Sequence, residues 1–374
     1  MRQTPRLLYI LAAALLLAFS ATEVQAQKKT LRERILNFLD SSNVKGTDPQ
    51  YIALPKKKWR VILSTSTDQQ YMKMDSHLEA PEAELEDDQT IDFGMKIKQP
   101  VANAIGLWAG YRGWGLGYSV ATSGTKGINM SFNIATPSNG VNIRIHRYKF
   151  DRPESYLSMK SSDFEMEGYL TDGSEAMESP INIESFVFDG YWVFNKKRFS
   201  LAAAYDQSVL QLRSSGSLIA GLMFYYQKFD YADPSNFLFI ECTNRIGRLK
   251  VYQGGIGIGY TYNWVPLKHL TINGVMMPVV SLFNHVDSFY YNIDDEWYEK
   301  EDLLLDYPEM TFNKRQGTNG HIRLNIDARL AVSYWIGNWF MSAIAQMHSF
   351  DSKYDNVDMK MSDWNIKGSV GVTF

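Results

Sequence analysis

Histidine and serine side chains are the groups in this sequence that could act as bases, nucleophiles or metal ligands. The six histidines form no H-E-x-x-H motif and no other metal-ligand spacing, so the sequence predicts neither a metal site nor a cofactor. Ser214, Ser215 or Ser217 could pair with His146 or His321 in a membrane acyl hydrolase or acyltransferase. No G-x-S-x-G surrounds these serines, so a lipid-modifying enzyme is the least favoured interpretation.

Polar and charged residues also recur at alternate positions of stretches whose other residues are apolar. The set that would face one way is Arg144, His146, Asp189, Asp206, Arg323, Asn325, Asp327, Arg329 and Lys367. In a barrel these residues would line the lumen, either as a mutually neutralising ladder or as a selectivity lining for anionic solutes. We favour the ladder, because a lumen of about 12 strands lies between small barrels filled by side chains and open porins.

The elements that must carry these residues are β-strands with two different faces. In Met359–Phe374 the even positions from Trp364 onward are apolar or Gly, and the odd positions are small or polar. Val251–Trp264 and Ile322–Ile336 alternate in the same way. A period of 2 puts one row of side chains on each face of a strand. In an outer-membrane barrel the apolar row faces lipid, whereas in a soluble sandwich it would face a core.

The last strand ends on Phe374, and this favours the membrane. It resembles outer-membrane barrels, whose assembly machinery recognises a C-terminal strand ending in Phe. We therefore expect outer-membrane lipid and the barrel-assembly machinery to be partners of this chain, with Phe374 as the assembly signal.

Connections between the expected strands form a short and a long set. The short ones are 99–103, around 137, 195–198, 265–268 and 337–338, and the long ones are 72–90, 151–180, 231–248 and 285–320. Barrels of this class have short periplasmic turns, long extracellular loops and periplasmic termini. The sets alternate almost throughout if 104–121 and 199–230 each cross once, with 122–127 and 351–358 as short external loops. This count predicts an all-β, antiparallel transmembrane barrel of about 12 strands. Splitting both stretches gives the alternative of 14 strands, but it places the acidic loop 151–180 in the periplasm.

Residues 1–26 have the features of a signal peptide. Basic residues precede the apolar run Leu7–Ala21, and Val24–Ala26 fits a cleavage site. Residues 27–57 are then expected to form a periplasmic segment with a short amphipathic helix, and residues 58–374 the outer-membrane barrel.

Composition excludes several other classes of protein. With 38 basic and 41 acidic residues the chain has no nucleic-acid footprint. After the signal peptide no segment reaches the roughly 18 apolar residues of a transmembrane helix. The single cysteine, Cys242, predicts no disulfide.

Several stretches together resemble one family. Asp48-Pro49-Gln50-Tyr51-Ile52, followed by a basic run and Trp59, is similar to its start. Lys197-Arg198-Phe199-Ser200 and the run from Gln207 to Ser217 are similar to its middle, and Gly371-Val372-Thr373-Phe374 to its end. This is the uncharacterised exported family of Bacteroidota catalogued as domain of unknown function 4421. The resemblance implies an outer-membrane barrel and supplies no activity and no catalytic residues.

The sequence therefore predicts an outer-membrane β-barrel with a structural or interaction role, or with a narrow lumen. A small-solute channel with a charged lumen is the first alternative, and an outer-membrane lipid-modifying enzyme is the second.

The two faces of Ile322–Ile336 predict opposite labelling of two cysteine variants in a Cys242→Ser background. Leu330→Cys should react with a lipid-soluble maleimide and resist a water-soluble one, because lipid surrounds it. Asn325→Cys should show the reverse if the lumen is wet. Mass spectrometry after labelling in membranes measures both, and equal labelling of the two positions would contradict the two-faced strand.

Overall fold

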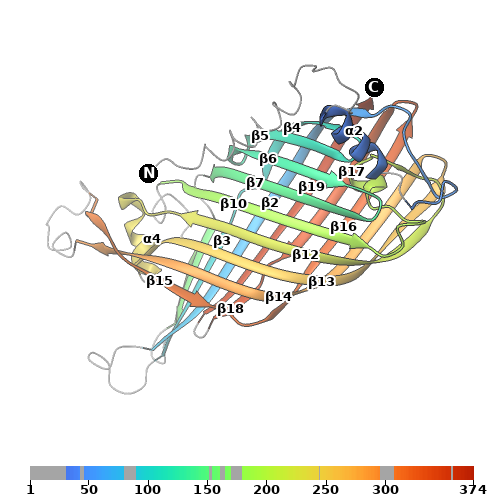
Figure 1. Cartoon of the computed structure of the whole chain (residues 1–374). Helices are drawn as coiled ribbons and strands as arrows, with labels where there is room; N and C mark the ends of the chain where they lie inside the picture. Colours follow the sequence, from blue (N-terminus) through green and yellow to red (C-terminus); the bar gives the residue numbers. More distant parts are fainter. Residues whose placement is uncertain are drawn as a thin grey trace.

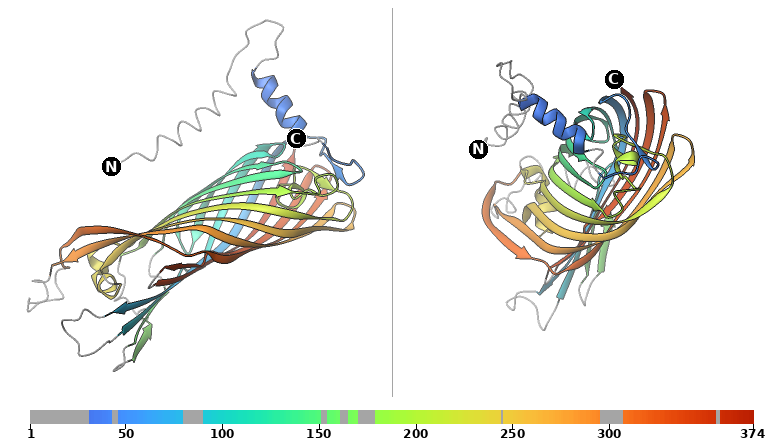
Figure 2. Two further views of the ribbon diagram at one scale, coloured as in Figure 1. Left: turned by 60° about the horizontal axis from the view of Figure 1, so that its bottom comes forward. Right: turned by 45° about the vertical axis from the view of Figure 1, so that its right-hand side comes forward.

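The computed structural model describes residues 31–42, 46–79, 90–150, 154–160, 165–169, 179–243, 245–294, 307–354 and 357–374. Its main element is an antiparallel sheet that closes on itself around one lumen (Figures 1 and 2). The expected signal peptide, residues 1–26, lies outside the described residues. Among the described residues, no helix has both the length and the hydropathy needed to cross a bilayer.

Twelve strand positions close the barrel, which confirms the predicted fold class. The strands are β2 (Trp59–Glu79), β3 (Thr90–Lys98), β4 (Ala102–Tyr111), β5 (Trp114–Ser123), β6 (Lys126–Ala135), β7 (Asn139–Phe150), β10 (Ile181–Val193), β12 (Ser215–Asp230), β13 (Ile246–Leu267), β14 (Leu270–Ile293), β16 (Arg323–Ile336), β17 (Trp339–Ser349) and β19 (Val357–Thr373). β3 and β4 share one position, because both pair with β2. The ring is completed by β7 pairing with β10 and by β19 pairing with β2.

Smaller elements lie at the two ends of the barrel. They are α2 (Leu31–Ser42), β1 (Ile52–Ala53), β8 (Glu154–Lys160), β9 (Glu165–Tyr169), α3 (Ala202–Tyr205), β11 (Leu210–Gln211), the 3-10 helix η1 (Pro234–Asn236), α4 (Phe237–Cys242), β15 (Met310–Asn319) and β18 (Ser352–Tyr354). We call the end that carries α2 and the C-terminus the near end, and the end that carries α4 and β15 the far end (Figure 2).

One predicted crossing and one predicted turn are wrong, although the strand number is right. The stretch 104–121 is two strands, β4 and β5, joined by a turn at Arg112 and Gly113. Arg112 has a φ of 56°, and a Cβ on Gly113 would lie 1.7 Å from a backbone carbonyl oxygen of β6. The predicted turn 99–103 lies within the single crossing made by β3 and β4. Pro100 lacks an N–H and so interrupts the ladder there without reversing the chain.

The long predicted loops contain more regular structure than expected. β2 continues to Glu79, α4 lies within 231–248, and β14 with β15 occupies much of 285–320. Strands can continue into these polar stretches because the backbone hydrogen bonds of a ladder require only an extended partner strand. They do not require apolar side chains. By contrast, the stretch 199–230 crosses only once, as predicted, because β12 begins at Ser215.

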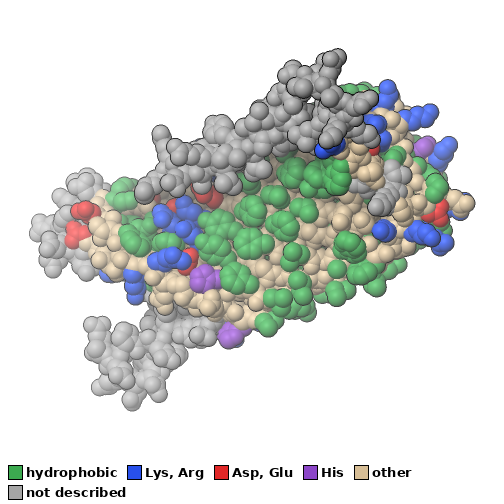
Figure 3. Space-filling model, in the orientation of Figure 1, with side chains coloured by type: hydrophobic (Ala, Val, Ile, Leu, Met, Phe, Trp, Pro, Cys, Tyr) green, Lys and Arg blue, Asp and Glu red, His purple; other side chains and the backbone are tan. Residues whose placement is uncertain are grey.

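The exterior carries the apolar belt that the alternation predicts (Figure 3). On β16 the exposed fractions are 67% for Leu324 and 54% for Leu330, against 3% for Asn325. Ile366 on β19 and Ile258 on β13 are exposed in the same way. A continuous apolar exterior of this kind is stable in lipid and not in water.

Glycines allow one large side chain to lie flat against the inner wall. A Cβ on Gly115 of β5 would come within 1.9 Å of the Trp108 ring, and one on Gly110 within 2.2 Å. Arg60 of β2 covers the indole from the lumen side, with its guanidinium carbon 4.8 Å from the ring centroid. Trp108 is thereby fixed between the wall and a buried cation.

Helix α2 forms where the sequence predicts a short helix, and it docks on the near end. Asp40 accepts hydrogen bonds from Lys58 (2.7 Å), Arg112 (3.0 Å) and Tyr111 (3.2 Å). Burial alone would raise the pKa of Asp40, but the hydrogen bonds from Lys58 and Arg112 outweigh it and hold this pKa below 3.8. The carboxylate therefore helps to hold the helix to the rim, together with the edge-to-face contact of Phe38 with Trp114.

Asp40→Asn should loosen α2 from the barrel rim. Because the folded-state pKa is lowered, docking is fully supported above pH 3.8 and weakens as the pH falls through that lowered value. These pairs are partly exposed, so the loss should be about 1 kcal/mol, or roughly fivefold more undocked helix. The rate of trypsin cleavage at Arg34 at pH 7 measures the change, with Asn37→Ala as the control. Equal cleavage of Asp40→Asn and wild type would contradict the docking role.

Candidate functional site in the lumen

A cavity of about 260 Å³ lies inside the barrel against β2, β4 to β7, β17 and β19. Its wall combines polar and apolar surface in similar amounts, and Ser, Gly and Asn occupy many of the inward positions. The predicted lumen residues that line it are Arg144, His146, Asp189, Asp206, Arg329 and Lys367. Six of the nine residues that the sequence pattern assigned to the lumen therefore line one cavity.

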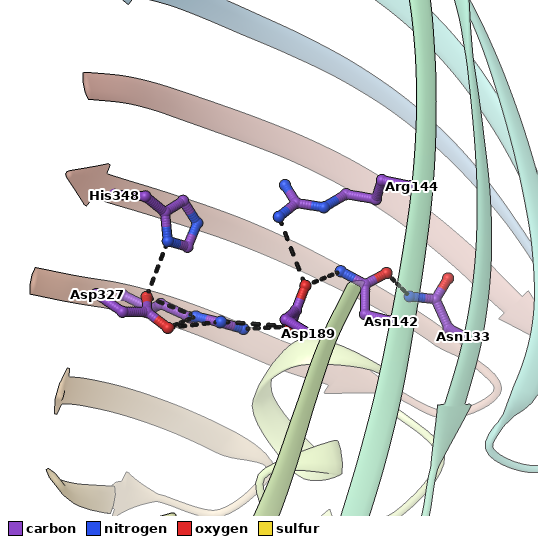
Figure 4. A network of polar contacts seen from close by, with 7 residues as sticks. Asn133, Asn142, Arg144, Asp189, Asp327 and His348 are labelled. Carbon is purple, nitrogen blue, oxygen red and sulfur yellow. Dashed lines mark hydrogen bonds and ion pairs between the residues drawn. The ribbon is translucent and has the colours of Figure 1, made fainter. Parts of the chain in front are cut away.

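A hydrogen-bonded row of amides leads across the wall to Asp189 (Figure 4). Trp108 Nε1 donates to Asn133 (3.2 Å), Asn133 donates to Asn142 (2.6 Å), and Asn142 donates to Asp189 (2.9 Å). Sheet register explains this row, because Asn133, Asn142 and Asp189 are directly paired on β6, β7 and β10. Arg144, on β7, approaches the same carboxylate at 3.5 Å.

Arg329 connects two walls of the lumen, β16 and β10, which lie four strand positions apart in the ring. It extends from β16 to Asp189 on β10, with both terminal nitrogens 3.3 Å from one carboxylate oxygen. The same guanidinium forms a two-oxygen contact with Asp327, at 2.6 and 2.9 Å, and His348 lies 3.3 Å from Asp327. Two arginines and two aspartates thus neutralise one another in a buried network.

An apolar layer closes the lumen on the far-end side of this network. Tyr225 of β12 stacks on Phe350 with ring centroids 4.3 Å apart, and Met72 and Met361 are buried beside them. The register pairs Tyr225 with Val187, two residues beyond Asp189. Most inward positions here are apolar, with Gln70 and Gln227 among them, so the lumen is less polar at this level.

The segment 199–211 closes the lumen on the near-end side. Gln211 donates to the Arg198 carbonyl (2.6 Å) and accepts from Ser200 N (3.1 Å), while Asn263 of β13 donates to both Ser200 and Gln211. β11 also pairs with β1. These bonds anchor the segment to the wall as an internal plug, which contains α3.

Arg60 is a buried lumen cation that the sequence analysis missed. It pairs with Asp206 at 3.0 Å, and its guanidinium also donates to the backbone carbonyls of Asp206 and Arg112. The signal was available, since Arg60 follows Trp59 at an inward position of β2. Asp206, in contrast, was predicted as a lumen residue and lies within the plug, immediately after helix α3.

The other predicted residues lie away from the cavity or at its edge. Arg323 is near the far end and pairs with Asp358 at 2.8 Å. Asn325 donates to Ser281 and accepts from Asp351 N. Phe374 is exposed beside Trp59, and the two residues exchange backbone hydrogen bonds. Its recognition by assembly machinery remains a prediction.

The predicted nucleophile and base are not brought together. Ser214 Oγ accepts a hydrogen bond from Val265 N, and Ser217 Oγ accepts one from Asn195 N, both at the near end. His321 lies beyond the other end of β16, where its N–H donates to the Lys353 carbonyl. His146 is buried in the wall of the cavity. Among the described residues, no group of three His, Cys, Asp or Glu side chains could hold a metal ion.

The closed antiparallel barrel and its apolar exterior define an outer-membrane β-barrel protein, since such barrels cross that membrane with every backbone group paired. A family described as "Domain of unknown function (DUF4421)" matches residues 46–374. The chain belongs to this family, as the resemblance indicated.

Solved structures with a similar arrangement are remote. The β-domain of the Bordetella autotransporter BrkA is 9% identical, with 85% of this chain and 100% of that chain covered and a TM-score of 0.29. The outer-membrane protease OmpT of Escherichia coli is 9% identical, with 86% and 98% covered and a TM-score of 0.32. The NalP translocator domain of Neisseria meningitidis is 10% identical, with 100% of both chains covered and a TM-score of 0.28. These similarities carry no argument about activity, and no curated protein matches the sequence.

Arg329→Met should lower the free energy of unfolding by about 3–5 kcal/mol, because Asp189 and Asp327 would stay buried without their partner. Urea unfolding in lipid vesicles, followed by tryptophan fluorescence, measures this loss. Arg147→Met is the matched control, since Arg147 pairs with Glu184 on the exposed face and should cost less than about 1 kcal/mol. Similar small losses in both variants would show that the cross-lumen contact contributes little.

Proposed function

We propose that this protein is a closed outer-membrane barrel that does not conduct ions in its resting state and has a structural or interaction role. The observation that carries the proposal is the contact of Arg329 with Asp189 across the lumen. It lies between the apolar layer of Tyr225 and Phe350 and the plug 199–211.

An ion passing through would have to overcome three successive barriers. It would break the buried network in which Arg329 pairs with Asp189 and Asp327, and this would separate charges that stabilise one another. It would then meet the apolar layer, where a narrow hydrophobic constriction excludes water and so blocks hydrated ions. The plug would also have to leave the wall, at the expense of the Asn263 and Gln211 hydrogen bonds.

A second candidate function, binding or slow passage of a small polar solute, is supported by the cavity itself. Among the described residues, Arg144 Nε, His146 Nε2, Asn129 Oδ1 and Tyr205 OH are buried there without a hydrogen-bond partner. Polar atoms in this state favour a guest that can donate and accept hydrogen bonds, whether water or a hydroxylated solute. A lipid-modifying enzyme is less favoured, because Ser214 and Ser217 are bonded at the near end, away from His321.

Planar-bilayer recordings of the purified protein should show no conductance steps. Opening the barriers with Arg329→Ala, Tyr225→Ala and Phe350→Ala together should produce steps, because the cross-lumen contact and the apolar layer are both removed. Trp192→Ala, which changes a lipid-facing ring, is the control and should stay silent. Heat-modifiable migration in gels would verify that each variant is folded. Steps from the wild type whose ion preference shifts in Lys367→Gln would contradict the closed barrel and support the channel.

A further inference from the structure

The outer surface of β12 to β15 changes from apolar to basic within a few residues of each strand. Leu222 and Ile256, paired on β12 and β13, are exposed within the apolar belt. Closer to the far end, the next two outward levels are aromatic: Phe224 follows Leu222 on β12, and beyond it Tyr226 lies against Tyr252 with ring centroids 5.0 Å apart. Aromatic rings at the edge of an apolar belt mark the interface between lipid tails and headgroups.

Immediately beyond this aromatic level lies a group of cations, Lys228, Arg248, Lys250 and Arg315, which we call the basic patch. The strand register brings its members together, since Lys228 pairs with Lys250 and Arg248 follows on β13. Figure 3 shows basic side chains gathered at the far-end side of the hydrophobic belt. The basic patch therefore lies at headgroup depth.

Two carboxylates hold the basic patch in place without neutralising it. Asp230 pairs with Lys228 (3.0 Å) and Arg248 (2.9 Å), and Asp287 pairs with Arg315 (2.7 Å). Glu184, opposite Lys228 on β10, pairs with Arg147 of β7. With this pair included, five cations against three carboxylates leave two positive charges, with His285 counted as neutral.

Among the described residues, Lys250 is the member of the basic patch that forms no close ion pair, although Asp287, which pairs with Arg315, lies opposite it in the β13–β14 register. In the described part of the chain its ammonium contacts the Phe289 ring, 4.9 Å from the centroid, and forms no ion pair. The Phe289 ring stabilises part of the Lys250 charge, but it offers no strong hydrogen-bond acceptor to the ammonium group. The hydrogen-bond donors of the Lys250 ammonium are thus open to a ligand. Lys228 and Arg248, which share the single carboxylate of Asp230, lie next to it.

We propose that the basic patch binds the phosphate group of an anionic lipid whose acyl chains lie on the adjacent apolar belt. A phosphate can accept hydrogen bonds from several Lys and Arg donors at once, and juxtamembrane cations attract anionic lipids. The continuity of apolar, aromatic and basic levels on the same strands favours a lipid over an acidic protein segment, which would leave the apolar and aromatic levels uncovered. This proposal does not depend on whether the lumen is closed.

Native mass spectrometry of the full chain in detergent, titrated with phosphatidic acid and separately with phosphatidylcholine, tests the proposal. Wild type should retain phosphatidic acid in preference to phosphatidylcholine. Lys228→Gln/Lys250→Gln should bind phosphatidic acid roughly 30-fold more weakly, at about fivefold for each cation removed. Lys197→Gln/Lys268→Gln removes the same charge from the near end and should bind like wild type.

Several results would overturn the proposal. One is equal retention of the two lipids by wild type, and another is equal weakening by the two double variants. Complete displacement of phosphatidic acid by an equal concentration of inorganic phosphate would identify a free-phosphate site and exclude a lipid site. Heat-modifiable migration, checked for both variants, separates loss of binding from loss of folding.

Discussion

Closure of the sheet between its first and last strands is the constraint on which the rest of this structure depends. In lipid an unpaired backbone N–H or C=O costs several kcal/mol, so no edge strand can be left open. β19 completes its ladder with β2, and at the rim Trp59 and Phe374 exchange backbone hydrogen bonds of 3.2 and 3.0 Å. Once 12 strands form a ring, the width of the interior is set, and the inward side chains have to fill it.

The interior is filled by two kinds of chemistry at different depths. Near its middle, Arg329, Asp189 and Asp327 satisfy one another, which removes the need for water at that level. Toward the far end, Tyr225, Phe350 and the methionines pack as an ordinary apolar core. An ion-pair network gives direction and register to the walls it joins, whereas apolar packing supplies most of the burial energy. The interior of the barrel is thus packed with side chains, as the core of a soluble protein is.

Period-2 alternation was sufficient to predict which face of β13, β16 and β19 meets lipid, because this pattern is local. On β10 and β12 both faces are apolar, because Ile183 and Met223 point inward while Phe186 and Leu222 point outward, so hydropathy alone distinguishes the two faces less clearly there. Contact between Arg329 and Asp189 could not be predicted from spacing, since it depends on the curvature of the whole ring. The turn at Arg112 was missed because Gly113 also fits a bulge within one strand.

Strand length also differs sharply around the ring, and this has a consequence for assembly. β13 has 22 residues and β14 has 24, whereas β5 and β6 have 10 each. β13 and β14 are joined by a tight turn at Lys268 and His269, so their long ladder can grow with the smallest loss of loop entropy. The pairing of β19 with β2 joins opposite ends of the chain, so its contacts are far apart in sequence and require the closure of a very long loop. The β13–β14 hairpin therefore has one of the lowest entropic costs of pairing in the ring, and the β19–β2 closure has the highest.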